Sequence, residues 1–283
     1  MKPSAIMNHL FCFGFGFSAE ALAKKLDRTQ WRITGTSRSE AGVARIRSMG
    51  FDAVRFDGSE RMSLEGVTHL VTSVPPDESG DPVLHSCRGE IARNAKKIHW
   101  TAYLSTTGVY GDRGGDWVDE SSPLAPSTTR GKRRLEAERA WLSLLPVHVF
   151  RLAGIYGPGR NALESVREGT AKRIVKPGQV FSRIHVDDIA GVLLASMAKP
   201  NPGAAYNVCD DEPCPPQDVI AYAAALLGVP PPPEIAFEDA KLSPMAASFY
   251  AESKRVSNAK IKEELGYRLI YPNYRAGLKA LLR

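Results

Sequence analysis

The stretch that decides the fold is Leu10-Phe11-Cys12-Phe13-Gly14-Phe15-Gly16-Phe17-Ser18-Ala19. Its apolar start is typical of a short strand, and the amphipathic stretch that follows it predicts a helix from about Ala19 to Leu26. The turn between them has a glycine for tight bending, a second glycine that lets a phosphate approach the backbone, and a small residue for close packing. We predict that Gly14, Phe15, Gly16, Phe17, Ser18 and Ala19 bind a dinucleotide pyrophosphate at the positive end of the helix.

Outward from this turn, the first two thirds of the 283-residue chain alternate β-rich runs with amphipathic stretches. This alternation is typical of βαβ units in a parallel sheet. The predicted strands are Leu10 to Phe13, Trp31 to Ser37, Phe51 to Phe56, His69 to Ser73, Thr101 to Ser105, Val147 to Leu152 and Ala205 to Val208. Helical spacing runs from Pro82 to Ile98 and again from Ile189 to Met197. We therefore predict an α/β fold, a doubly wound Rossmann sheet with a smaller C-terminal α+β domain.

The chain is expected to form one intertwined body with two domains. Residues 1–155 form the predicted dinucleotide-binding domain, which is completed by about 183–209. Beyond residue 156 glycines and prolines interrupt the pattern, and residues 156–182 and 210–283 form the predicted small substrate-binding domain.

Composition limits the partners. A net charge of +6 permits anionic partners, yet the densest basic stretch, Arg130 to Arg139, is interrupted by acidic residues and lacks the interleaved aromatics of a nucleic-acid surface. No apolar run is long enough to span a membrane, and residues 1–9 lack a signal peptide's features, so we expect a cytoplasmic monomer or homodimer. The four cysteines lack metal-ligand spacing, so we expect reduced structural thiols and no metal.

The end of the second predicted strand reads Thr36-Ser37-Arg38, about 20 residues after the glycine turn, where a ribose-binding residue is expected. An acidic residue there would accept from the 2′-hydroxyl of NAD and repel a phosphate. Ser37 and Arg38 instead offer a hydroxyl donor and a positive charge. The sequence therefore favours NADP(H) as the cofactor.

Five motifs together resemble the extended short-chain dehydrogenase/reductase superfamily, the NAD(P)-dependent epimerase/dehydratase-like group, and more closely its atypical members. The resemblance runs nearly end to end. The motifs are the segments Gly14 to Ala19, Tyr103 to Gly111, Arg151 to Arg160, Arg183 to Ala190 and Tyr206 to Val208.

The resemblance implies several roles for residues of this chain. Thr106 would orient a substrate oxygen, Asp57 would touch the adenine, and Arg183 would meet a substrate phosphate. The wall of the cofactor path would include Ser73, Val74 and Pro75. Each residue also has a plain structural role open to it: Thr106 could end a strand, Asp57 could cap a turn, and Arg183 could pair with Asp187 or Asp188.

The chain departs from the family where the catalytic Tyr-x-x-x-Lys is expected, because residues 126–138 contain no tyrosine. Two registers remain open: Thr128 with Lys132, or Arg130 with Arg134. Helix geometry favours the second, since Lys132, Glu136, Arg139 and Ser143 form one polar stripe, whereas Arg130, Arg134 and Glu138 share the side of Trp141 and Leu145.

An arginine keeps its proton, with a pKa above about 12, and cannot be the general acid or base near neutral pH. Arg134 could still hydrogen-bond the ribose, and Arg130 could bind an anion. Tyr110 and Tyr156 are then the available phenols, with Tyr110 as a catalytic candidate. Arg130, Arg160 and Arg183 favour an anionic or nucleotide-linked small-molecule substrate.

Two hypotheses follow for the function. The first is an NADP(H)-binding oxidoreductase or epimerase with an altered active site. The second is a non-catalytic NADP(H)-binding sensor or regulatory protein.

Overall fold

The computed structural model describes residues 7–282. They form two compact units. Unit 1 contains the residues up to Ser105, Arg133–Phe150 and Leu193–Ala205, and unit 2 contains Thr106–Lys132, Arg151–Val192 and the residues from Tyr206 onward. The predicted domain boundary at residue 155 differs from this division. The prediction placed Thr106–Lys132 in the dinucleotide-binding domain, whereas this segment is part of the compact unit 2. A substrate-binding role for the predicted C-terminal domain stays a prediction.

The central feature of the fold is a parallel sheet with the strand order β11-β7-β5-β4-β1-β2-β3. Its strands are β1 (Asn8–Phe13), β2 (Trp31–Ser37), β3 (Asp52–Arg55), β4 (His69–Thr72), β5 (Trp100–Thr106), β7 (His148–Leu152) and β11 (Ala205–Val208). Strand β1 pairs in parallel with both β2 and β4, so the chain order reverses beside it. Doubly wound sheets bind ligands at the carboxyl ends of the strands around such a reversal. The predicted fold class is confirmed.

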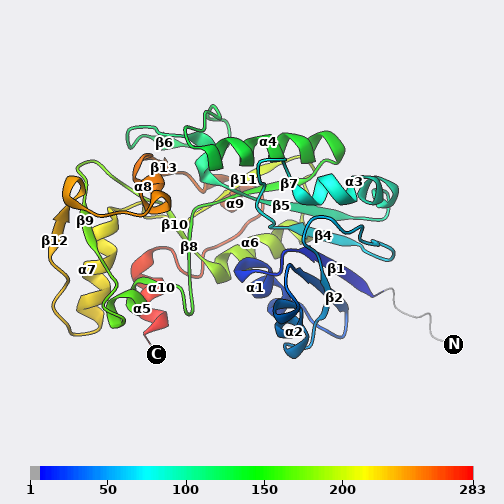
Figure 1. Ribbon diagram of the computed structural model, residues 1–283, viewed down its shortest axis with the longest axis horizontal. Coiled ribbons are helices and arrows are strands. Elements are labelled where there is room, and N and C mark those ends of the chain that lie inside the picture. Colours follow the sequence, from blue (N-terminus) through cyan, green and yellow to red (C-terminus); the bar gives the residue numbers. More distant parts are fainter. Residues whose placement is uncertain (1–6, 283) are drawn as a thin grey trace. The chain divides into compact units, whose positions relative to one another are not determined.

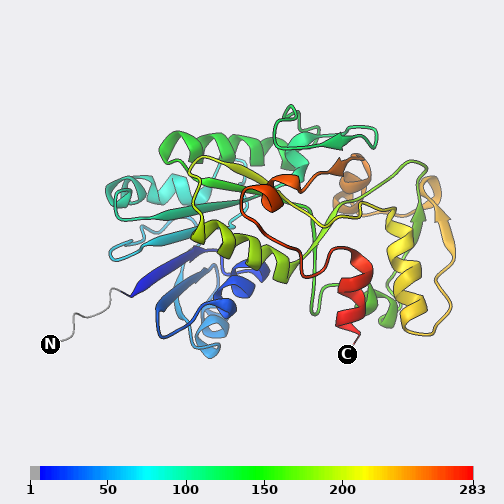
Figure 2. The same ribbon diagram turned by 180° about the vertical axis from the view of Figure 1, so that it is seen from behind.

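Helices cover both faces of this sheet. They are α1 (Phe17–Lys25), α2 (Glu40–Ser48), α3 (Pro82–Asn94), α4 (Thr129–Leu144) and α6 (Val186–Ala198). Within unit 1, α3 and α4 lie along one face and α1 and α2 along the other (Figures 1 and 2). The α3 and α4 side is a continuous apolar core in which Val83 and Ile91 pack with Phe13 and Trp141.

Asp81 joins the two helices of that layer. One oxygen caps α3 by accepting from the backbone N–H groups of Val83 (2.9 Å) and Leu84 (3.1 Å). The other accepts from the indole N–H of Trp141 on α4 at 2.9 Å. Pro82 at the first turn of α3 has no N–H that would need an acceptor there, and the predicted helix start is confirmed.

Unit 2 combines short strands, helices and turns. Its elements are η1 (Thr107–Tyr110), β6 (Trp117–Val118), β8 (Gly154–Tyr156), α5 (Ala162–Arg167), β9 (Arg173–Val175), β10 (Arg183–His185), α7 (Pro216–Leu226), β12 (Glu234–Ala236), η2 (Phe237–Asp239), α8 (Pro244–Tyr250), β13 (Arg255–Val256), α9 (Ala259–Glu263) and α10 (Tyr274–Leu281). Pairs β8–β10, β9–β12 and β6–β13 are each parallel. A second apolar core joins α5, α7 and α10 through Leu163, Ala223 and Leu278.

The predicted elements are present, with small shifts at their ends. Strands Trp31–Ser37 and Ala205–Val208 have the predicted bounds. The helix expected to reach Ile98 ends at Asn94, whose side-chain amide donates to the Glu90 carbonyl at 3.0 Å. Such a side-chain bond offers the backbone an alternative to further helix.

None of the helices among residues 7–282 is both long and apolar enough to cross a bilayer. The prediction that the chain lacks a signal peptide concerns residues 1–9, and residues 1–6 of that stretch lie outside the described residues. All four cysteines are buried and form no disulfide within the described chain, as predicted.

Candidate functional site

The glycine turn of unit 1 is held open by backbone geometry. Gly14 has a φ of +80°, and a Cβ there would lie 2.8 Å from the hydroxyl oxygen of Ser73. Its N–H donates to Oγ1 of Thr36 at 2.8 Å, and its carbonyl accepts from the Ser73 hydroxyl at 2.7 Å. Only glycine fits this position, and the predicted residue Ser73 shapes the turn directly.

The start of α1 is open to a ligand. Gly16 is the N-cap and supplies no side-chain cap, and a Cβ built on it would meet nothing within 4 Å. The first N–H groups of a helix have no partner inside the helix and attract anions. Ser18 and Ala19 are buried beneath them. The turn therefore has the geometry that a dinucleotide pyrophosphate needs, and binding of the pyrophosphate there stays a prediction.

The side chain of Phe15 has a different place from that ligand-facing end. It is buried, and its ring centroid lies 5.5 Å from that of Phe51. It fills the space beside Gly35, where a Cβ would lie 2.4 and 2.6 Å from two ring carbons of Phe15. The ring of Phe15 therefore does not face the cofactor, and its backbone N–H donates to the carbonyl of Thr36 at 2.9 Å. Its ring anchors the turn to β2.

The end of β2 carries the predicted phosphate-recognition residues. Ser37 is half-buried and Arg38 is exposed. Ser39 begins α2 by accepting from the N–H of Gly42 at 3.1 Å. A hydroxyl and a guanidinium thus stand directly before a capped helix start, which suits a 2′-phosphate.

Asp57 adopts the turn-capping geometry that the sequence left open. Its Oδ1 accepts from the hydroxyl (2.7 Å) and N–H (3.1 Å) of Ser59, and Oδ2 accepts from Arg55 at 3.1 Å. The hydrogen bonds from Ser59 lower the pKa of Asp57 to about 2. A contact with adenine stays a prediction. The remaining predicted wall residues flank the turn: Val74 lies 3.3 Å from a Cβ at Gly14, and Pro75 is exposed.

Helix α4 presents the predicted faces except at Arg130, which is exposed although the sequence placed it on the inner side. Lys132, Glu136, Arg139 and Ser143 are exposed, whereas Glu138 and Trp141 are buried. Arg134 lies on the inner side, where Nη1 donates to the hydroxyl of Tyr103 (3.2 Å) and to the carbonyl of Leu104 (2.9 Å). The inward position of Arg134 fits the register that pairs it with Arg130, and the match of these two residues to the family's tyrosine and lysine stays a prediction.

The first turn of α4 belongs to unit 2, and it is pressed against the turn that precedes Gly111. A Cβ on Gly131 would lie 2.7 Å from the carbonyl oxygen of Gly108, so a side chain has no room there. The adjacent Arg130 is exposed, with its guanidinium 5.5 Å from the ring centroid of Phe249 on α8. Thr106 caps η1 by accepting from the N–H of Gly108 at 3.2 Å.

Tyr110 is fully buried in unit 2. Its hydroxyl donates to Oδ1 of Asn207 at 2.7 Å and accepts from Arg151 at 2.9 Å. Burial raises the pKa of Tyr110 to about 12. This geometry favours a packing role over the predicted catalytic one. The phenol is buried and its hydroxyl makes two hydrogen bonds within the protein, so it cannot reach a substrate.

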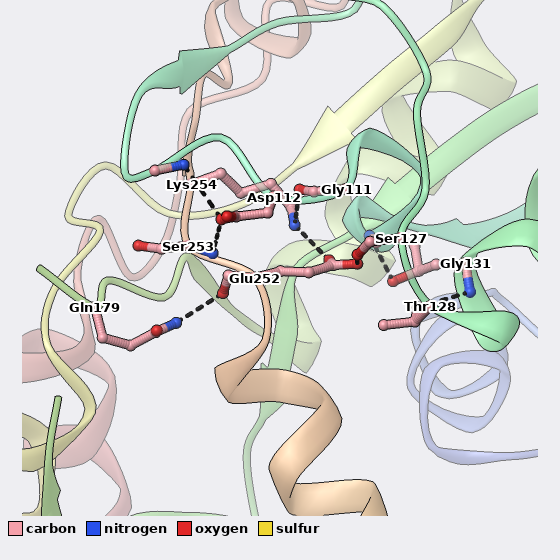
Figure 3. A network of polar contacts seen from close by, with 12 residues as sticks. Gly111, Asp112, Ser127, Thr128, Gly131, Gln179, Glu252, Ser253 and Lys254 are labelled. Carbon is pink, nitrogen blue, oxygen red and sulfur yellow. Dashed lines mark hydrogen bonds and ion pairs between the residues drawn. The ribbon is translucent and has the colours of Figure 1, made fainter. Parts of the chain in front are cut away.

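A buried polar network in unit 2 fixes the segments around Gly111 and Ser127 (Figure 3). Lys254 donates to the carbonyl of Gly111 and to Oε2 of Glu252, each at 2.7 Å. Oε1 of Glu252 accepts from the hydroxyl of Ser127 at 2.7 Å. The backbone N–H of Ser253 donates to Asp112 at 2.7 Å.

The sequence does not reveal this network, because charged residues are expected at the surface and the residues of the network lie far apart in the chain. The network has a structural role. It holds the turn after Tyr110 and the chain that leads into Arg130 in one arrangement.

A pocket of about 340 Å³ lies within unit 2. Its walls combine two cationic side chains, Lys172 and Arg183, with Tyr156, Tyr250 and Tyr274. Apolar residues of α7 and α10 complete the lining. Pockets of this volume with a few convergent polar groups are typical of small-molecule sites.

The two arginines predicted to bind substrate differ in position. Nη1 of Arg183 donates to the carbonyl of Phe181 at 3.0 Å and lies 3.0 Å from Sγ of Cys214, while the residue lines the pocket. Asp188, one of the two carboxylates that the sequence offered as its partner, accepts instead from Tyr267 and the backbone at 270 and 271. Arg160 is exposed and outside the pocket lining, where its backbone closes a turn with Gly157.

Asp210 is a second group that the sequence did not indicate. It is 1% exposed, its N–H donates to the carbonyl of Arg183 at 2.6 Å, and Oδ2 has no hydrogen-bond partner among the described residues. Burial raises the pKa of Asp210 to about 8. This carboxyl group follows strand β11 closely in the sequence and lies beside a wall residue of the pocket.

Comparisons with known proteins agree with this fold. No family model matches the chain. Protein YeeZ of Escherichia coli is 29% identical over 290 residues, covering 96% of this chain and 97% of that protein. A 3-diazoavenalumate denitrifying reductase of a Streptomyces species is 27% identical over 238 residues, covering 79% of this chain and 72% of that protein.

Several solved structures have the same fold as this chain. A functionally unknown conserved protein of Silicibacter pomeroyi is 56% identical with a TM-score of 0.92, and the match covers 98% of each chain. A Methylobacillus flagellatus protein proposed to be an NAD-dependent epimerase/dehydratase is 26% identical with a TM-score of 0.72, again over 98% of each chain. The UDP-glucuronic acid 4-epimerase of Bacillus cereus, solved with NAD, shares the fold at 16% identity and a TM-score of 0.75, over 97% of this chain and 95% of that one. The strand order and these structural neighbours show that the chain has the Rossmann fold of NAD-dependent epimerases and dehydratases, consistent with the resemblance to the extended short-chain dehydrogenase/reductase superfamily.

Proposed function

We propose that the chain is an NADP(H)-dependent oxidoreductase that reduces a small anionic molecule. The observation that carries the proposal is the glycine turn: Gly14 is fixed at positive φ, Gly16 leaves the start of α1 uncapped, and Ser37 with Arg38 follows the next strand. Each feature suits one part of the dinucleotide.

The cofactor would be held by unit 1. In the turn from Gly14 to Ala19, the N–H groups from Gly16 onward would bind the pyrophosphate. Ser37 and Arg38 would bind the 2′-phosphate and Asp57 the adenine, with Ser73 to Pro75 beside the turn. When bound, the nicotinamide supplies or accepts a hydride. Arg134 would complete the ribose contacts with the N–H groups that Tyr103 and Leu104 leave unused.

The substrate would be anionic because Lys172 and Arg183 line the same pocket of unit 2. Aromatic side chains at Tyr156, Tyr250 and Tyr274 add flat apolar surface suited to a ring or a conjugated chain. Arg130 and Arg160 do not line this pocket, and they are proposed only as exposed cations that attract an anionic substrate to unit 2. Thr106 would orient an oxygen atom of the substrate.

Reduction is favoured over epimerisation by the residues at the family's acid/base positions. Arg130 and Arg134 cannot exchange a proton near neutral pH. Hydride addition to an electrophile that already carries positive charge, or that expels a leaving group, needs no protein acid. The similarity to a Streptomyces reductase whose name records removal of nitrogen from a diazo compound supports this reading.

The protein is proposed to act in the cytoplasm, as a monomer or homodimer. Four buried, unpaired cysteines suit a reducing compartment.

The experiment is NADPH oxidation by the purified protein across a panel of carbonyl, iminium and diazo compounds, each with and without a carboxylate. Turnover should appear with carboxylate-bearing members. Arg183→Met and Lys172→Met should raise KM more than they lower kcat, because both residues hold the anion. The exposed Lys132→Met variant is the matched control. Absence of turnover with every member would contradict the proposal.

A second candidate is a non-catalytic NADP(H) sensor. It is favoured by the burial of Tyr110, whose hydroxyl makes two hydrogen bonds within the protein. It is also favoured by Arg130 and Arg134, which would stand where the resembled family has its catalytic tyrosine and lysine. A sensor would bind NADP and NADPH with clearly different affinity and show no turnover with any compound. An equal affinity for the two forms would contradict it.

A further inference from the structure

Arg45, in the middle of α2, reaches the glycine turn of unit 1. Nη1 lies 2.6 Å from Oε2 of Glu20, and Nη2 donates to the carbonyl of Phe15 at 3.0 Å. One guanidinium therefore contacts α1 and the glycine turn at once. We call Arg45, Glu20 and the Phe15 carbonyl the Arg45 clasp.

The carboxylate of Glu20 gives the positive charge of Arg45 a role. It lies in the first turn of α1, close to the helix end that must accept two phosphate charges. A carboxylate at that end would repel a pyrophosphate. Lys24 lies 2.6 Å from its other oxygen, so Glu20 is flanked by two cations and the local charge sum is positive.

The clasp also fixes the backbone of the turn. The N–H of Phe15 donates to the carbonyl of Thr36 at 2.9 Å, and its carbonyl accepts from Arg45. With the ring of Phe15 buried, the whole residue is held by other protein groups. The N–H groups from Gly16 onward are the ones left to face a ligand.

We propose that Arg45 is a positioning residue for the bound dinucleotide, which orients the glycine turn through Phe15 and cancels the charge of Glu20 where the pyrophosphate binds. The proposal rests on the proposed function. It separates two arginines of adjoining segments: Arg45 acts on the pyrophosphate that NAD and NADP share, whereas Arg38 acts on the 2′-phosphate that only NADP carries.

The test is a set of fluorescence titrations with NADPH and with NADH on the full chain. The variants are Arg45→Met, Arg45→Lys, Glu20→Gln and the double variant Arg45→Met with Glu20→Gln. Arg47→Met is the matched control, because Arg47 lies on the same helix and donates instead to the carbonyl of Ala53 at 2.9 Å. Thermal unfolding is measured for each variant.

Arg45→Met should weaken NADPH and NADH by the same factor, roughly three- to tenfold, so that their ratio stays constant. Arg45→Lys should retain part of the affinity. Adding Glu20→Gln to Arg45→Met should recover part of the lost affinity without a matching gain in unfolding temperature, which a purely structural role would not produce. Glu20→Gln alone should tighten both nucleotides, and this result does not depend on the folding of an Arg45 variant.

Three results would overturn the inference. They are unchanged binding by Arg45→Met, selective loss of NADPH alone, and unchanged or weaker binding by Glu20→Gln. Failure of the wild-type chain to bind either nucleotide would instead contradict the proposed function itself.

Discussion

Replacing Asp210 by asparagine should stabilise the protein, by an amount that grows as the pH rises. Asp210 is buried, and its Oδ2 has no hydrogen-bond partner among the described residues. Burial raises the pKa of Asp210 from 3.8 to about 8. The folded protein thus keeps a proton on this group over a pH range in which the unfolded chain has lost it.

The sign follows from proton linkage. Between about pH 4 and pH 8 the folded state binds more protons at Asp210 than the unfolded state does, so rising pH favours unfolding. Each pH unit in that range costs about 1.4 kcal/mol at most. The Asp210→Asn variant has no such titration, because the amide that it introduces is neutral in both states. The stability advantage of the variant should therefore grow by up to about 3 kcal/mol between pH 5 and pH 7.

The assay is urea unfolding of both proteins at pH 5, 6, 7 and 7.5, followed by circular dichroism. Subtracting the wild-type free energy of unfolding at each pH removes the contributions of all other groups. Asp239→Asn, a change at an exposed carboxylate, is the control and should show no comparable slope. A flat difference for the Asp210→Asn variant, or one that falls with pH, would refute the reasoning.

Two further predictions concern the glycine turn and the buried network. Gly14→Ala should lower the free energy of unfolding by about 1–3 kcal/mol, because it forces a Cβ into a positive-φ position. Gly16→Ala should unfold like the wild type yet bind NADPH weakly, because its Cβ meets no protein atom and only a bound pyrophosphate would contact it; equal losses of stability in both variants would contradict this contrast. Lys254→Met should cost about 3–5 kcal/mol by leaving Glu252 charged and buried, and the double variant with Glu252→Gln should cost less. Chemical denaturation measures each value, and a double variant that is less stable than Lys254→Met would show that the pair does not act through charge.

The sequence allowed the fold to be predicted because its signals are local. The turn from Gly14 to Ala19 follows an apolar strand directly, and the strand and helix periodicities need only neighbouring residues. The faces of α4 were predictable for the same reason: Lys132 and Glu136 are exposed and Trp141 is buried because of their helical spacing.

The parts of the site that the sequence did not reveal depend on contacts between distant segments. The hydroxyl of Tyr110 is bonded by Arg151 and Asn207, which come from strands β7 and β11. Glu252 and Lys254 read as surface charges until the fold brings Gly111 and Ser127 to them. Arg45 is equally ordinary on an amphipathic helix, and only the packing of α2 beside α1 gives it Phe15 as a partner.

The central claim is that unit 1 binds NADP(H) and recognises its 2′-phosphate. The most direct measurement is isothermal titration of NADPH and NADH into the wild-type chain and the Arg38→Met variant. NADPH should bind the wild type at least about tenfold more tightly than NADH, and Arg38→Met should remove most of that preference while leaving NADH binding unchanged. Equal affinity for the two nucleotides, or tighter binding of NADH, would contradict the account.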